Sequence, residues 1–192
     1  MLCIYNAIIV NEGSRFIGSV LVEGEIIRKV IAGEGRPAEQ CDEWLDAQGC
    51  YLIPGVIDDH VHFRDPGLTH KADMATETAS GVTSFMDMPN CNPQTTTLEA
   101  LDNKFADAAT KCVVNYSFYF GATNNNADML SQLDKTHVCG VKLFMGASTG
   151  NMLVDRMDAL RKIFSGAGML IAVHCEDQQV IRRNTERIRE QY

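Results

Sequence analysis

The 192-residue sequence lacks the features of a nucleic-acid-binding or membrane protein. Its 17 Lys and Arg residues are outnumbered by 25 Asp and Glu residues, and no basic stripe is present to contact phosphates. The longest apolar stretches, such as 169–173, are far shorter than the roughly 20 residues of a membrane-spanning helix. The first residues have neither a basic region nor a cleavage-site pattern, so we expect no signal peptide. Composition therefore argues against nucleic acid and membranes as partners.

The sequence also has no Cys-x-x-Cys pair among its seven cysteines. An odd number of cysteines without paired spacing does not indicate a disulfide framework. We expect reduced thiols and a cytoplasmic protein. The remaining composition, with 45% hydrophobic and 22% charged residues, is typical of a globular protein.

Two regions with different patterns follow one another along the chain. Within residues 1–51, short β-branched runs alternate with Gly-containing turns, which is typical of hairpins. Residues 52–192 alternate short apolar strands with helical segments, and the strand starts recur about every 30 residues. We expect these strands at 52–57, 82–86, 113–120, 141–145 and 169–173. The sequence thus predicts a small β domain followed by five βα units of a parallel sheet.

A doubly wound sheet and a (β/α)8 barrel both fit this alternation. Neither G-x-G-x-x-G nor G-x-x-x-x-G-K-[ST] occurs, so nucleotide-binding open sheets have no support. An eight-stranded barrel takes about 250 residues, whereas about 140 follow residue 51. We therefore expect an α/β fold with the first five βα units of a TIM-type barrel, preceded by a small β-sandwich segment. We also expect the chain to be the N-terminal part of a longer protein.

Three histidines fall at the ends of predicted barrel strands, where such barrels carry their active sites. His60 and His62 follow the first strand, and side chains two residues apart share a face on which they can bind one metal ion. His174 comes at the corresponding place after the fifth strand. A lone pair or a lone core histidine is commonplace, but three histidines at one rim favour a metal site.

A lysine lies inside the fourth predicted strand. Lys142 is flanked by apolar residues, and a buried ammonium is costly. Either the side chain reaches solvent at an edge, or its pKa is lowered and the amine is neutral. A neutral amine can react with carbon dioxide to give a carbamate, which can bridge two metal ions.

The segments 60–67 and 87–90 resemble the dihydroorotases, within the amidohydrolase superfamily of metal-dependent barrel hydrolases. The resemblance covers the whole chain, including the leading β region, and the first segment is highly specific. It implies a binuclear zinc site with these ligands: His60 and His62 on one ion, His174 on the other, and carboxylated Lys142 as the bridge.

The same resemblance implies that Arg64 and Asn90 bind the substrate carboxylate. Arg64 lies two residues beyond His62 and shares its face, and a planar guanidinium suits a carboxylate. Asn90 can donate from its amide, although asparagine is also common in Pro-Asn turns. Asp65 is either a partner of Arg64 or a loop acid, and we give it no catalytic role.

The implied activity is that of a dihydroorotase, which reversibly converts dihydroorotate and water to N-carbamoyl-L-aspartate in pyrimidine biosynthesis. The family's catalytic aspartate and fourth histidine ligand come from later strands, so we expect residues 1–192 alone to have little activity. A homodimer is common in the family. Three alternatives stay open: an allantoinase or hydantoinase, whose substrates lack the carboxylate that Arg64 would bind; a non-catalytic assembly subunit; and a metal-independent α/β domain.

Overall fold

The computed structural model describes residues 1–78, 81–146 and 150–191 of the chain. The chain divides into two compact units, Met1–Gly55 and Val56–Tyr192, whereas the sequence places the change of pattern after residue 51. All seven cysteines are unpaired. None of the helices in the described ranges is long and apolar enough to cross a membrane.

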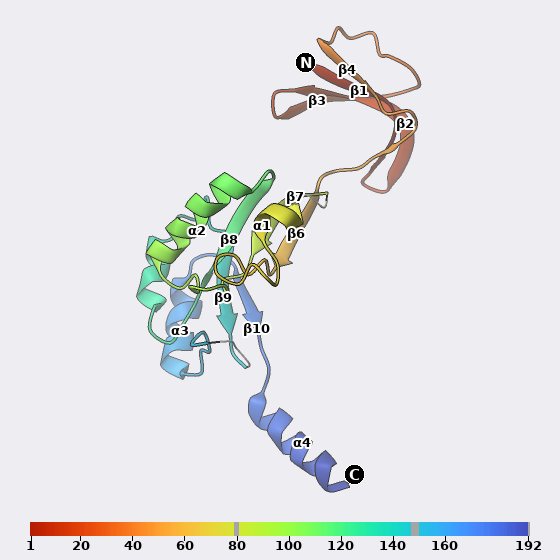
Figure 1. Cartoon of the computed structure of the whole chain (residues 1–192). Coiled ribbons are helices and arrows are strands. Elements are labelled where there is room, and N and C mark those ends of the chain that lie inside the picture. The colour runs from red at the N-terminus through yellow and green to blue at the C-terminus, as the bar shows by residue number, and fades with distance from the viewer. Residues whose placement is uncertain (79–80, 147–149, 192) are drawn as a thin grey trace. The chain divides into compact units, whose positions relative to one another are not determined.

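The first unit is a five-stranded sheet (Figure 1). Its strands are β1 (Leu2–Asn11), β2 (Ser14–Glu23), β3 (Ile26–Ala32), β4 (Glu43–Asp46) and β5 (Tyr51–Leu52). The first three form antiparallel hairpins in the order β3-β2-β1, and β4 and β5 both pair parallel with β1. Glu12 and Gly13 both have positive φ, which allows the tight turn between β1 and β2.

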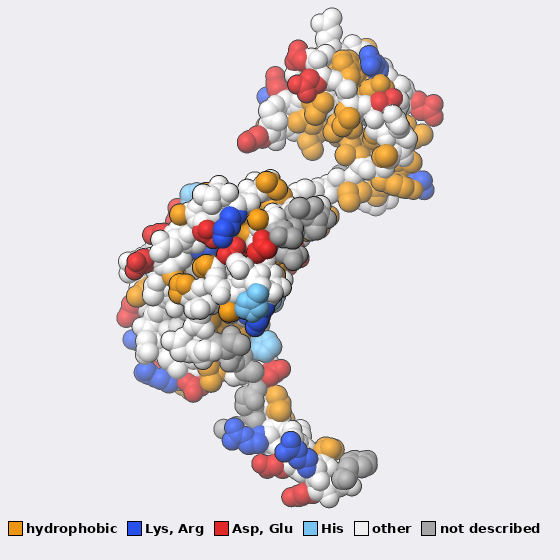
Figure 2. All heavy atoms as spheres, viewed as in Figure 1, with side chains coloured by type: hydrophobic (Ala, Val, Ile, Leu, Met, Phe, Trp, Pro, Cys, Tyr) orange, Lys and Arg blue, Asp and Glu red, His pale blue; other side chains and the backbone are white. Residues whose placement is uncertain are grey.

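The small core of this unit lies between the hairpin and the chain that follows it. Ala7, Ile9 and Val20 are buried together. Other apolar side chains stay exposed, including Ile26 and Ile27 of β3. Figure 2 shows hydrophobic side chains gathered on the visible face of this unit.

The second unit contains five parallel strands in sequential order, β10-β9-β8-β7-β6. The strands are β6 (Val56–Val61), β7 (Val82–Asp87), β8 (Asn115–Gly121), β9 (Gly140–Phe144) and β10 (Ile171–His174). Neighbouring parallel strands joined by helical crossovers are the repeating unit of a (β/α) barrel. The carboxyl ends of all five strands therefore lie at one edge of the sheet.

Helical segments connect these strands. They are α1 (Met74–Glu77), α2 (Leu98–Lys111), the 3-10 helix η2 (Ala127–Gln132) and α3 (Met157–Gly166), and α4 (Gln178–Gln191) follows β10. Thr97 caps α2 by accepting a hydrogen bond from the Ala100 amide, 3.1 Å away. Figure 1 shows α2 and α3 on the same side of the sheet. Their apolar side chains, including Leu101 and Ile163, bury the aromatic residues of β7 and β8.

The first predicted barrel strand is misplaced. The sequence pattern predicts it at 52–57, but Leu52 ends β5 in the first unit and β6 begins at Val56. Pro54 and Gly55 separate the two strands, because proline lacks an amide hydrogen and both residues favour a break in the ladder. One consequence is that His60 lies within β6 rather than after it, and His62 directly follows the strand.

Candidate active site

The site residues lie on the face of the sheet that α2 and α3 do not cover. Val61 and Val141 belong to the core shared with the helices, so their strand neighbours point to the opposite face. His60 and His62 are the neighbours of Val61, and Lys142 is a neighbour of Val141. The side chain of Tyr119 in β8 lies on the same face. Its hydroxyl donates to the Asp59 backbone carbonyl, 3.2 Å away.

His60 and His62 lie close together at the end of β6. Their ring centroids are 5.3 Å apart, and the ring planes are tilted by 51°. His62 Nδ1 lies 2.8 Å from Asn90 Oδ1. Because an amide oxygen only accepts hydrogen bonds, Nδ1 carries the proton and the lone pair of Nε2 stays available. This is the tautomer that a histidine needs to bind a metal ion through Nε2.

The charge state of His62 also suits a ligand. Burial is the main cause that lowers the pKa of His62, and the neighbouring Arg64 and His60 act in the same direction. The hydrogen bond with Asn90 and the charge of Asp87 act in the opposite direction. The net shift favours the neutral imidazole, the form that coordinates metals.

Arg64 is held in a defined position beside this pair. Its Nη1 donates to the Asn90 carbonyl oxygen at 2.9 Å. Its backbone has φ 61°, a left-handed conformation that is uncommon for a residue with a side chain. The Leu68 amide donates to the Arg64 carbonyl at 3.0 Å and closes the loop. A guanidinium carries five N–H donors, so Arg64 has further donors of the kind that bind an anion.

Arg64 and Asn90 line a pocket of about 600 Å³ between the loops that follow β6 and β7 and the segment at 150–151. Its polar lining consists of Arg64, Lys71, Asn90, Asn92, Gln94 and Asn151. No acidic residue contributes to the lining within the ranges that the structure describes. Two cations and several amides make this a pocket suited to an anionic group such as a carboxylate.

Lys142 is buried in the middle of β9, with 3% of its surface exposed. Its Nζ lies 5.1 Å from the ring centroid of Phe144. No acidic side chain in the described part of the chain pairs with it. Burial lowers the pKa of Lys142 below its ordinary value of 10.5. The edge-lysine alternative is therefore wrong, because Lys142 lies in a strand with neighbours on both sides.

His174 ends β10 next to Lys142. Ala172 is in register with Lys142, and His174 is in register with Phe144, so all four side chains share one face. The rings of Phe144 and His174 are 6.0 Å apart. The imidazole is exposed, and its Nε2 lies 3.8 Å from Glu176 Oε1.

The predicted site residues thus form two groups. His60, His62, Arg64 and Asn90 lie together at the ends of β6 and β7, and Lys142 and His174 lie together at β9 and β10. Among the described residues, no three or more His, Cys, Asp or Glu side chains come close enough to hold one metal ion. The donor chemistry nevertheless fits zinc, because neutral imidazoles are zinc ligands and an amine whose charged form is disfavoured by burial can become a carbamate.

Sequence reasoning missed a buried ion pair behind this site. Lys104 Nζ lies 2.6 Å from Asp87 Oδ2, and both side chains are fully buried. Lys104 lies between Leu101 and Phe105 on the buried side of α2, and this lysine on an apolar helix face was the available signal. The structure also places Asp65: it pairs with Lys111 at 3.1 Å.

The strand order, the parallel pairing and the side chains at the carboxyl ends together define the class of fold: five consecutive strands of a (β/α) barrel with a separate β sheet before them. The solved structure of an L-hydantoinase (dihydropyrimidinase) from Arthrobacter aurescens matches with a TM-score of 0.83 and 26% identity. The match covers 98% of this chain and 44% of the hydantoinase. The expected fold class is confirmed.

Curated relatives are similar over most of the chain. It is 34% identical over 196 residues to an allantoinase from Deinococcus radiodurans, covering 91% of this chain and 43% of the relative. It is 37% identical over 142 residues to a dihydroorotase from Halobacterium salinarum, covering 70% of this chain and 33% of the relative. No protein-family model matches the sequence. The chain is therefore a homologue of proteins named dihydroorotase and allantoinase, and it spans less than half of their length.

Proposed function

We propose that this chain supplies the first five strands of a cyclic amidohydrolase, and that its substrate carries a carboxylate, as dihydroorotate does. The observation that carries this proposal is the pocket at the ends of β6 and β7, which Arg64 and Asn90 line, together with the hydrogen bond that joins Asn90 to His62. A carboxylate held by Arg64 would place the ring of a cyclic amide next to the two histidines.

Each residue of the chain has a separate task in this proposal. Asn90 keeps the proton of His62 on Nδ1, holds the Arg64 side chain through its backbone carbonyl, and donates from its side-chain amide to the substrate carboxylate. Arg64 orients the substrate with its remaining guanidinium donors. The neutral amine of Lys142 bonds to the carbon of CO2 and releases a proton, which gives a carbamate with two oxygen donors.

The proposed metal is zinc, two ions per site, with His60, His62, His174 and carboxylated Lys142 as ligands. Zinc supplies a nucleophile at neutral pH and a Lewis acid for the amide carbonyl. The general base of the reaction would come from an aspartate on a later barrel strand, as the resemblance to dihydroorotases implies.

Hydantoinase or allantoinase activity is the competing proposal, and relatives with these names support it. Hydantoin and allantoin have no carboxylate for Arg64. The two proposals therefore differ in what the anion-binding pocket does.

The experiment compares hydrolysis of dihydroorotate, hydantoin and allantoin by the complete barrel and by its Arg64→Lys variant. We expect dihydroorotate to be the best substrate, and kcat/KM to fall about 10- to 100-fold in the variant, because a point charge cannot reproduce two parallel hydrogen bonds. Arg161→Lys, the same substitution at an exposed arginine of α3, serves as the matched control and should change kcat/KM little. Faster hydrolysis of hydantoin or allantoin by the parent would reject the dihydroorotase assignment.

A further inference from the structure

The Asp87–Lys104 ion pair has no task in the proposed chemistry, yet it is the most deeply buried charge pair in the described ranges. Both side chains have no exposed surface, and Nζ also lies 4.8 Å from the ring centroid of Phe118. A buried ion pair rarely stabilises a fold more than apolar side chains of similar volume would. Stability alone therefore gives a weak reason for this pair.

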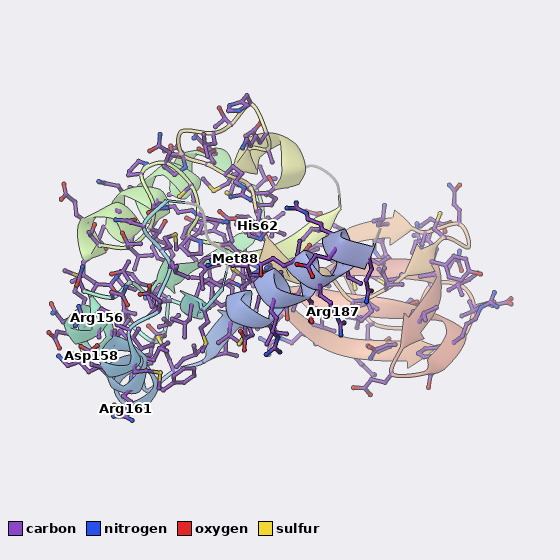
Figure 3. All side chains as sticks on the ribbon, turned by 90° about the horizontal axis from the view of Figure 1, so that it is seen from below. His62, Met88, Arg156, Asp158, Arg161 and Arg187 are labelled. Atoms are coloured by element: carbon purple, nitrogen blue, oxygen red, sulfur yellow. The ribbon has the colours of Figure 1, made fainter. Side chains whose placement is uncertain are left out.

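The hydrogen bonds of the pair reach the two chain segments that carry His62 and Asn90. Asp87 Oδ1 accepts from the amide of Phe63, the residue after His62, at 2.9 Å. Lys104 Nζ donates to the carbonyl of Met88, two residues before Asn90, at 3.2 Å. Figure 3 shows His62 and Met88 close together, and the Met88 amide donates to the Val61 carbonyl at 2.9 Å.

The backbone ladder does not fix these segments by itself. The pairing of β6 with β7 is irregular between Asp58 and Val61, directly before His62. Beyond Val61 and Asp87 the two strands have ended. Beyond the backbone bond between Met88 and Val61, the two side chains hold the loops: Asp87 accepts from Phe63 in the β6 loop, and Lys104 donates to Met88 in the β7 loop.

We propose that Asp87 and Lys104 are positioning residues that set the His62–Asn90 hydrogen bond, and through it the tautomer and direction of the His62 ring. Helix α2 then acts as the rigid support of the site, since Lys104 extends from its buried side. The consequence for metal affinity rests on the proposed function, because it requires His62 to be a zinc ligand.

Two double variants separate positioning from stability. Asp87→Leu with Lys104→Met removes the hydrogen bonds but leaves no unpaired buried charge, so the chain should stay folded. Asp87→Asn with Lys104→Gln keeps a neutral donor and acceptor at the same places. We expect zinc affinity, measured by competition with a chelator, to fall about 10-fold or more in the apolar variant and by less than about 3-fold in the amide variant.

A second readout does not need metal. The 15N shifts of the His62 imidazole should report the Nδ1–H tautomer in the parent and in the amide variant. The apolar variant should show mixed tautomers, while its urea midpoint stays equal to that of the parent or rises. Lys111→Met removes another paired lysine from α2 and is the matched control, with no change expected in the His62 shifts.

The proposal is overturned if the apolar variant keeps the parent tautomer, or if Lys111→Met disturbs His62 as much as the apolar variant does. If the parent binds no zinc, the metal assignment under the proposed function fails instead. The tautomer measurement still decides the positioning role in that case. If the apolar variant does not fold, the amide variant decides: the parent tautomer supports positioning by hydrogen bonds, and mixed tautomers contradict it.

Discussion

The two halves of the candidate site differ in how firmly contacts within the chain hold their side chains. At the ends of β6 and β7, His62, Asn90 and Arg64 hold one another through hydrogen bonds of 2.8 and 2.9 Å. At β9 and β10, Lys142 is buried without an acidic partner in the described residues, and His174 is exposed. The first half is preorganised, whereas in the second half no acidic side chain of the described residues balances the charge of an ammonium at Lys142.

This difference indicates that the β9–β10 half depends on a chemical reaction, the carboxylation of Lys142. A buried ammonium without a partner raises the free energy of the folded state, so the neutral amine is favoured. Carboxylation converts that amine into an anion, which needs cations in turn. We therefore expect the β9–β10 half to be completed only when CO2 and metal are both bound, while the β6–β7 half is ready before either arrives.

The largest effect should come from removing the amine. In the complete barrel, Lys142→Ala should lower zinc content and reduce turnover at least about 1,000-fold, because the proposed bridge is lost. Short carboxylic acids that occupy the vacated space should restore part of both. Unchanged zinc content and turnover would remove Lys142 from the proposed mechanism.

A smaller effect should come from the preorganised half. Asn90→Ala removes the acceptor of His62 Nδ1, and we expect zinc affinity to fall about 10- to 100-fold. The control is Asn92→Ala, which lines the same pocket and leaves the His62–Asn90 bond in place. Equal zinc affinities in both variants would contradict the preorganisation of this half.

The smallest effect concerns stability in the absence of CO2 and metal. Lys142→Met should raise the free energy of unfolding by about 1–3 kcal/mol at neutral pH, because it removes an amine whose charged form is disfavoured by burial. The pKa of Lys142 is lowered in the folded state, so the unfolded chain binds more protons between that pKa and 10.5. The parent's stability should rise with pH across this window, and the advantage of Lys142→Met should shrink.

Urea titrations at several pH values measure this difference. Lys162→Met changes an exposed lysine of α3 and should give a difference that does not depend on pH. A Lys142→Met variant that is less stable than the parent at neutral pH would show that the ammonium is well solvated in the folded state.

Most of the fold could be predicted because its signals are local. The Gly-containing turns predict the hairpins of β1 to β3, and the apolar runs predict β7 to β10 within about two residues, the usual scatter at strand ends. β4 and β5 were missed because they are only four and two residues long and pair with β1 across more than 40 positions. The predicted bounds of the first barrel strand are wrong for the same reason, because Leu52 pairs with Ile9 in the first unit.

The candidate site could be predicted only in part. The motif around His60 and His62 indicates the proposed metal ligands, and the closeness of the two rings follows from the strand period. The contact between His62 and Asn90 could not be foreseen, because it depends on how two loops meet. The lysine on the apolar face of α2 was a signal for a buried Lys104, but its ion pair could not be predicted, because only the tertiary fold brings Asp87 close to it.

The most direct test of the difference between the two halves is 13C NMR of the protein equilibrated with 13C-labelled bicarbonate, with and without zinc. The account predicts a protein-bound carbamate signal that grows when zinc is added and is lost in Lys142→Met. In Asn90→Ala the carbamate signal should still appear, but at a higher zinc concentration than in the parent. No carbamate signal with zinc present, or a signal that persists in Lys142→Met, would contradict the account.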